Sequence, residues 1–282
     1  MDKQLSPLTH YAYSRALKKL EEAGYTVEEF GRKPAAVYKY IQSLKFSASY
    51  TKLYLSAILH AMKQANSSAD ISFYQKKVQE LLKQTKEKED SQRLHPAREA
   101  ELLPWPEITA LRGKVMETYG DDSMEYIIYC LYTLNPPVRL DYTNMKIVKS
   151  MRSVRPGKNY CVVTDGSIRF VFQEYKTSKK YGKVVVEASK ELREVLEDWV
   201  EGKEFLLPIK TATTLGRKVV EIFKECSGKS IGVSLLRHSY ITWFLGQPRT
   251  IKEKKEIAKK MMHSKELQEQ YHIIKGDSSD SE

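Results

Sequence analysis

Residues Ser234–Tyr240 read Ser-Leu-Leu-Arg-His-Ser-Tyr, and Met262-His263-Ser264 and then Tyr271 follow them along the chain. An arginine guanidinium binds two phosphate oxygens at once, and a histidine hydrogen-bonds an oxyanion or moves a proton near neutral pH. A tyrosine hydroxyl attacks phosphorus and carries it as a covalent ester. This order of residues predicts a site that cuts and rejoins a phosphodiester through a tyrosine, with no metal and no other cofactor.

The chain is basic along its whole length. Its 282 residues carry a formal net charge of +11, and residues 1–90 contribute 15 Lys and Arg against 10 Asp and Glu. The excess is therefore shared by both halves and is not confined to one arm. Duplex DNA carries one charge per roughly 1.7 Å of axis, so this charge favours double-stranded DNA as the partner. Charge alone fits an ordinary lysine-rich protein equally well.

The sequence carries no sign of secretion or of a membrane span. Cys130, Cys161 and Cys226 have no metal-ligand spacing, and such a sparse, odd set indicates a reducing compartment. No apolar run follows Met1, and no stretch approaches the roughly 18 apolar residues of a membrane helix. We therefore expect an intracellular protein, in the cytoplasm or a host nucleus, that is not secreted.

Helix signals without strand signals fill the first 90 residues. Ser6-Pro7 predicts a capped helix start, Thr26 with Glu29 predicts a capping box, and four short helices would form a compact bundle. A polar stretch then separates this bundle from the rest of the chain. The predicted organisation is a helical DNA-binding domain at 1–90, a linker at 91–104, a catalytic domain at 105–275 and an acidic tail at 276–282. The candidate DNA contacts of the bundle are Lys45, Lys52 and Lys63.

A patch rich in strand signals interrupts the helical pattern of the second domain. Strands are predicted at 160–163, 168–175 and 183–187, with Asp165-Gly166 as the turn between the first two. The predicted fold class is therefore mainly α with a small β-sheet, as an N-terminal helical bundle followed by an α+β domain.

Four short stretches of the chain resemble the motifs of the tyrosine recombinases, the family of phage-type integrases and site-specific recombinases. The C-terminal part is similar to their catalytic domain and the N-terminal helices to their core-binding domain, so the resemblance covers nearly the whole chain. It implies a strand transferase without a cofactor that acts on double-stranded DNA. It also implies a tetramer on synapsed DNA, formed from free monomers or dimers.

The first stretch is Pro136–Tyr142, in which the resemblance implies that Arg139 clamps an oxygen of the scissile phosphate. Asp141 would orient this arginine. The family usually has Gly before the arginine and an acidic residue three positions after it, whereas here Pro-Pro precedes it and the acid comes at two. Such a Pro-Pro variant resembles recombinases of virus-associated mobile elements. The alternative is a simple Arg139–Asp141 pair at a helix start.

The second stretch is Tyr175–Gly182, between two predicted strands, where the family places its catalytic lysine. The resemblance implies that Lys176 is the general acid for the leaving 5′-oxygen, with Lys179 and Lys180 as competitors for this role. The alternative is a solvated basic turn that contacts backbone phosphate.

The third and fourth stretches contain the residues quoted first. Arg237 would be the second clamp arginine, and His238 would support its helix. The family usually has His where this chain has Ser234, which is a good helix N-cap and a poor base. His263 would bind the phosphate and Tyr271 would be the nucleophile, although Met precedes His263 where the family has Gly. The gap from His263 to Tyr271 is eight residues and not the usual nine.

These motifs together predict a site-specific recombinase or integrase that acts through a 3′-phosphotyrosine, as in mobile elements or viral genome integration. A type IB topoisomerase shares the residue set, but would be expected to begin with a β-rich domain. The Ser234 departure leaves open a DNA-binding protein that kept the fold and lost turnover. Tyr271 as a mere packing residue is the alternative for the nucleophile.

Overall fold

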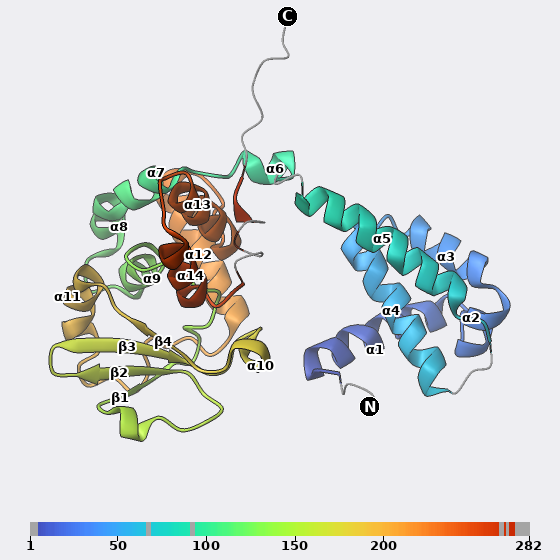
Figure 1. Cartoon of the computed structure of the whole chain (residues 1–282), viewed down its shortest axis with the longest axis horizontal. Helices are drawn as coiled ribbons and strands as arrows, with labels where there is room; N and C mark the ends of the chain where they lie inside the picture. The colour runs from blue at the N-terminus through green and yellow to red at the C-terminus, as the bar shows by residue number, and fades with distance from the viewer. Residues whose placement is uncertain (1–4, 66–68, 91–93, 265–267, 269–270, 274–282) are drawn as a thin grey trace, which may run out of the picture. The chain divides into compact units, whose positions relative to one another are not determined.

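The computed structural model describes residues 5–65, 69–90, 94–264, 268 and 271–273. The chain forms two compact units, Met1–Ser91 and Gln92–Glu282, drawn in Figure 1 in blue to teal and in green to red. The tail predicted at 276–282 lies outside the described residues. Among the helices described, none is long and apolar enough to cross a membrane.

The first unit is a helical bundle. Its helices are α1 (Pro7–Glu22), α2 (Val27–Arg32), α3 (Pro34–Ser43), α4 (Ala48–Gln64) and α5 (Ser72–Asp90). Helix α4 packs against both α1 and α5 and buries Leu55, Ile58 and Met62 on the inner face. Within the described residues there are five helices and not the predicted four, because residues 27–32 form a separate short helix.

Two of the predicted helix starts can be compared with the capping contacts. Ser6 caps α1 as predicted, since its Oγ accepts a hydrogen bond from the Thr9 amide at 3.2 Å. The capping box predicted at Thr26 is wrong, because this side chain caps no amide of α2. A capping box is present instead at the start of α14, between Thr250 and Glu253.

The second unit combines helices with a small sheet. Its helices are α6 (Pro96–Glu99), α7 (Trp105–Ala110), α8 (Arg112–Tyr119), α9 (Met124–Thr133), the 3-10 turn η1 (Met151–Ser153), α10 (Ser178–Tyr181), α11 (Lys190–Trp199), α12 (Ala212–Ser227), α13 (Val233–Leu245) and α14 (Ile251–Lys260). Its strands are β1 (Lys146–Val148), β2 (Tyr160–Thr164), β3 (Ser167–Phe172) and β4 (Val184–Glu187). The predicted fold class, mainly helical with a small sheet, is confirmed.

The sheet is mixed, with strand order β1-β2-β3-β4. Strands β2, β3 and β4 are antiparallel, and Thr164 faces Ser167 across the predicted Asp165-Gly166 turn, where Gly166 has φ 71°. Strand β1, which pairs parallel with β2, was not predicted. Its three residues are too few to show the alternation by which a strand is recognised in a sequence.

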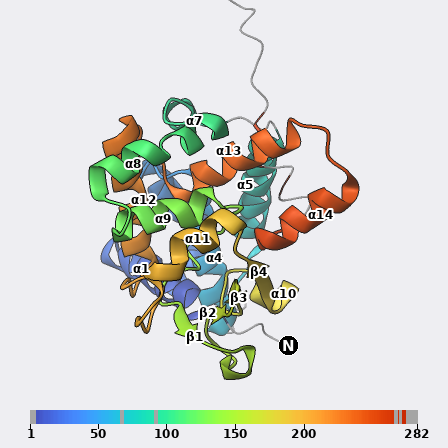
Figure 2. The same cartoon turned by 90° about the vertical axis from the view of Figure 1, so that its left-hand side faces the viewer.

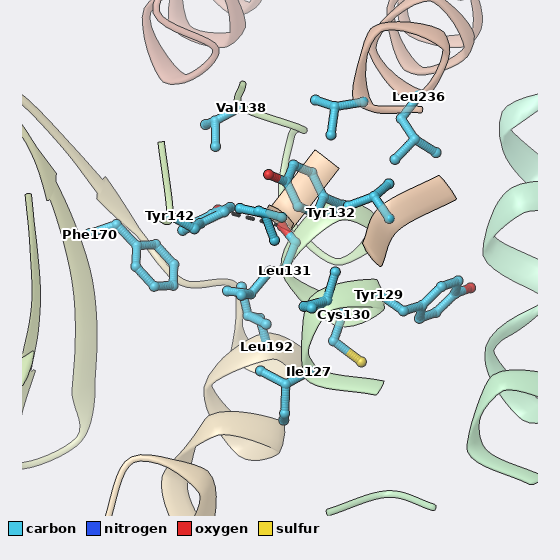
Figure 3. Close-up of a cluster of buried hydrophobic side chains, with 14 of the residues drawn as sticks. Ile127, Tyr129, Cys130, Leu131, Tyr132, Val138, Tyr142, Phe170, Leu192 and Leu236 are labelled. Carbon is cyan, nitrogen blue, oxygen red and sulfur yellow. Dashed lines mark hydrogen bonds between the residues drawn. The ribbon is translucent and has the colours of Figure 1, made fainter. Parts of the chain in front are cut away.

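Helix α9 is the centre of the core of the second unit. Every residue from Tyr126 to Thr133 is buried, so this helix is apolar all round, as expected of a core helix. Tyr142 packs edge-on between Tyr132 of α9 and Phe170 of β3, with ring centroids 5.6 and 5.2 Å away (Figure 3). The Tyr132 hydroxyl donates to the carbonyl of Arg139 at 2.8 Å, so the core fixes the backbone of this arginine.

Candidate active site

Helix α13 carries Arg237 into the core. The helix begins after Gly232, and the Ser234 side chain is exposed in the first turn and caps nothing. The prediction that Ser234 is the N-cap is therefore wrong, because the helix starts before it. Arg237, one turn later, is only 1% exposed. A guanidinium at this depth is rare unless it has a charged or strongly polar partner.

The two arginines meet at the end of α14. Arg139 donates from Nη1 to the Met262 carbonyl at 3.2 Å, and Arg237 donates from Nη1 to the carbonyls of Met261 at 3.4 Å and Pro137 at 2.7 Å. The two guanidinium groups, far apart in the sequence, thus bind adjacent carbonyls of one turn. Arg237 keeps Nε and Nη2 without a hydrogen-bond partner among the described residues.

This turn is a Schellman motif that ends α14. The Met262 amide donates to the Lys259 carbonyl at 3.0 Å, and the His263 amide donates to the Ala258 carbonyl at 3.1 Å. Met262 has φ 54°, the left-handed conformation that favours glycine. In this chain the methionine side chain is buried, at 1% exposed.

We expect Met262→Gly to destabilise the fold by roughly 1–3 kcal/mol. Relief of the left-handed backbone contributes about 1–2 kcal/mol of stability, but loss of a buried methionine side chain costs about 2–5 kcal/mol. Denaturant unfolding measures the difference, and Met262→Leu, which keeps both the conformation and most of the volume, is the matched control. A glycine variant more stable than the wild type would show that backbone strain outweighs the packing.

His263 faces the same place and is buried, with no hydrogen-bond partner for either ring nitrogen among the described residues. Burial lowers the pKa of His263 to about 3, and the charges of Arg237 and Arg139 contribute to this. The ring is therefore neutral at pH 7, with one nitrogen able to donate and one able to accept. Its centroid lies 6.0 Å from that of Tyr271, in an edge-on arrangement.

Tyr271 is half-buried against Arg237, whose Cζ lies 5.1 Å from the centre of the tyrosine ring. Burial lowers the pKa of Arg237, which Tyr271 opposes and Arg139 reinforces. The His238 ring is tilted against the tyrosine ring, with ring centroids 4.6 Å apart, and its Nδ1 lies 2.9 Å from the Tyr271 carbonyl oxygen. The structure thus brings Arg139, Arg237, His263 and Tyr271 together.

Asp141 lies near this group without pairing to it. Its Oδ2 is buried and has no hydrogen-bond partner among the described residues. Burial raises the pKa of Asp141 to about 6, although Arg139 and Arg237 act in the opposite direction. The alternative interpretation of Arg139, an ion pair at a helix start, is not what the structure contains, because residues 136–140 are not helical.

The lysine stretch follows β3, which ends at Phe172, earlier than predicted. Lys176 is exposed, and the next residue, Thr177, donates from Oγ1 to the Met262 carbonyl at 3.0 Å. Arg139 and this loop therefore share one acceptor. Lys179 and Lys180 are exposed on the short helix α10.

A hollow of about 470 Å³ opens beside His263, between α10, β4 and α14, which lie near one another in Figure 2. Lys180 lines one side, and Lys255 and Lys259 of α14 line the other. These two lysines were missed in the sequence analysis. Their spacing of four residues, on a lysine-rich helix that leads to His263, was the available signal.

The predicted DNA contacts of the first unit lie at one end of α4 and along it. Lys45, exposed before α4, has φ 50°, while Lys52 is half-buried and Lys63 is exposed on the helix. An α-helix has 3.6 residues per turn, so Lys52 and Lys63 lie on the same face of α4. The aromatic side chain of Tyr50 is 48% exposed at the start of this helix.

Comparisons with known proteins give only a likeness of fold. No protein-family model matches the chain, and no curated protein matches it in sequence. Among solved structures, that of XerA recombinase is similar, with a TM-score of 0.45 and 16% identity over 98% of this chain and 90% of that chain. The candidate site rests on the contacts described above.

Proposed function

We propose that this chain is a DNA strand transferase of the tyrosine recombinase type. The observation that carries the proposal is a buried set of polar groups that have no hydrogen-bond partner among the described residues. Arg237 has two unpartnered guanidinium positions and His263 two unpartnered ring nitrogens among the described residues. Buried donors left unpaired cost free energy, so they indicate an anion that completes the site. Tyr271 against Arg237 supplies a nucleophile at that position.

The proposed reaction begins when the Tyr271 oxygen attacks the scissile phosphorus. Arg139, Arg237 and His263 bind the equatorial oxygens, on which the transition state spreads its charge. Lys176 gives its proton to the 5′-oxygen as the bond to phosphorus breaks. The resulting 3′-phosphotyrosine keeps the energy of the phosphodiester, so a 5′-hydroxyl can reverse the attack and join strands.

The proton of the attacking hydroxyl has no obvious acceptor at Ser234, which is exposed at the start of α13. Tyr271 is only half-buried, so in the proposed reaction water takes this proton as the tyrosine oxygen attacks phosphorus. Loss of the family histidine at this position also supports a second candidate function, a DNA-binding protein of the same fold that lacks turnover. In its more specific form, the first proposal is that the strand transferase recombines the DNA of a mobile or viral element, with four protomers on synapsed DNA.

A nicked suicide duplex tests the proposal. Cleavage near the nick releases a short oligonucleotide, so a covalent 3′-adduct accumulates. A pool of such duplexes, followed by sequencing of the trapped DNA, removes the need to know the target. We expect an adduct that migrates with the protein on denaturing gels. Binding without any adduct would favour the second candidate, and relaxation of supercoils without strand exchange would indicate a topoisomerase.

Affinity for DNA is expected to fall steeply with salt, with log affinity decreasing by about 0.9 per log unit of salt for each phosphate neutralised. The double variant Lys255→Gln and Lys259→Gln should reduce this slope by about two. The matched control is Lys224→Gln, which changes an exposed lysine on α12, away from the hollow that Lys255 and Lys259 line. This control should leave the slope unchanged. Anisotropy titrations at several salt concentrations measure it. Equal slopes for the wild type, the double variant and the control would show that these two lysines of α14 do not contact DNA phosphates.

A further inference from the structure

Helix α13 holds the backbone around Tyr271 at two points. The Nδ1 of His238 lies 2.9 Å from the Tyr271 carbonyl, and the Ile273 amide donates to Oγ1 of Thr242 at 3.0 Å. A carbonyl oxygen only accepts, so Nδ1 of His238 carries the proton of the first bond. The two bonds therefore hold the main chain at the carbonyl of Tyr271 and at the amide of Ile273.

The two contacts come from one face of one helix. His238 and Thr242 are four residues apart, which places their side chains one above the other on α13. The Ile273 side chain is buried at 6% exposed and lines a hollow with Trp105 and Trp243. Two hydrogen bonds and one buried apolar side chain thus hold the segment at the helix.

The same helix carries Arg237, directly before His238. The Arg237 guanidinium lies over the Tyr271 ring. The centroid of the His238 ring lies 4.6 Å from the centroid of the same tyrosine ring. Helix α13 therefore carries the proposed clamp arginine and also holds the main chain of the nucleophile segment. Groups held by rigid elements keep a reactive geometry better than groups on free loops, and a misplacement of about 1 Å can cost about a hundredfold in rate.

We infer that His238 and Thr242 are positioning residues that hold the Tyr271 hydroxyl at the scissile phosphate. This inference rests on the proposed strand-transfer function. Neither residue touches the reacting atoms, since Thr242 acts through the main chain of the nucleophile segment and His238 acts through this main chain and the tyrosine ring. The competing explanation is that the two bonds only dock the C-terminal segment for stability.

Paired variants separate the two explanations. Thr242→Val removes the accepting oxygen and keeps the shape, whereas Thr242→Ser keeps the oxygen. His238→Leu removes the donor, whereas His238→Asn keeps an N–H near the place of Nδ1. Ser239→Ala is the matched control, because Ser239 makes a similar bond from α13 to the Leu103 carbonyl, at 2.6 Å.

The measurements are the single-turnover rate of adduct formation on a nicked duplex, the Kd for uncut duplex and the melting temperature. We expect Thr242→Val and His238→Leu to slow adduct formation by about 10- to 100-fold with unchanged Kd. Thr242→Ser and His238→Asn should restore the rate to within about threefold of the wild type. Ser239→Ala should lower the melting temperature and leave the rate of the folded protein unchanged.

The outcomes distinguish the inference from the function on which it rests. No adduct with the wild-type protein would overturn both. An adduct that forms equally fast in Thr242→Val and Thr242→Ser, and in His238→Leu and His238→Asn, would overturn the inference and leave the function in place. If the valine variant does not fold, the leucine and asparagine pair at 238 gives the same comparison.

Discussion

Replacement of Arg237 by methionine is expected to slow covalent cleavage by about 10²- to 10³-fold, the loss seen when one preorganised oxyanion donor is removed. The folded protein should nevertheless be as stable as the wild type or more stable. Arg237 is 1% exposed, and two of its donor nitrogens have no partner among the described residues. Burying a charge without a charged partner costs free energy, so the removal of this charge by an apolar side chain of similar volume is expected to offset the loss of the hydrogen bonds to Pro137 and Met261.

This opposite movement of activity and stability separates a functional arginine from a structural one. Single-turnover cleavage and denaturant unfolding of the same preparation measure the two quantities. Arg237→Lys completes the series, because a lysine keeps the charge but cannot form the bidentate fork, so cleavage should stay low. Normal cleavage by Arg237→Met would contradict the proposed site. A large loss of stability would show instead that Arg237 serves mainly to stabilise the fold through its hydrogen bonds to Pro137 and Met261.

The sequence predicted those parts of the fold that depend on local signals. Ser6 caps its helix because a hydroxyl before a helical run satisfies a free amide. Gly166 follows Asp165 between two apolar runs, and the antiparallel pair forms there as predicted. Strand β1 could not be found in this way, because it is short and exists through pairing with β2.

The residues of the candidate site were predicted from the sequence. The contacts that arrange these residues in space were not predicted. Nothing local in the sequence indicates that the Met262 carbonyl accepts from both Arg139 and Thr177. Likewise, His238 was predicted to support its own helix, whereas its ring bonds the main chain of Tyr271. Such contacts join segments that are distant along the chain, so they depend on packing that a single sequence does not encode in a readable pattern.

Tyr271→Phe is expected to abolish the covalent adduct and to leave the fold and DNA binding intact. Phenylalanine keeps the ring that packs against Arg237 and His238 and removes only the attacking oxygen. The backbone bond from His238 to the carbonyl of residue 271 does not involve the side chain, so it also remains. Melting temperature and Kd for uncut duplex are therefore expected to match the wild type.

Peptide mapping of the trapped wild-type adduct then identifies the nucleophile. The rival is Tyr181, which is 36% exposed and lines the basic hollow beside His263. The cation beside each ring favours Tyr271 over it. The Tyr271 ring lies against the buried guanidinium of Arg237, whereas the Tyr181 ring lies under the exposed Lys180, whose Nζ is 5.2 Å from the ring centroid. Buried cations stabilise a developing anion more than solvated ones, because water screens the latter. A phosphotyrosine at 181, or an undiminished adduct in Tyr271→Phe, would contradict the assignment, while loss of the adduct together with loss of binding would point to a packing role for Tyr271.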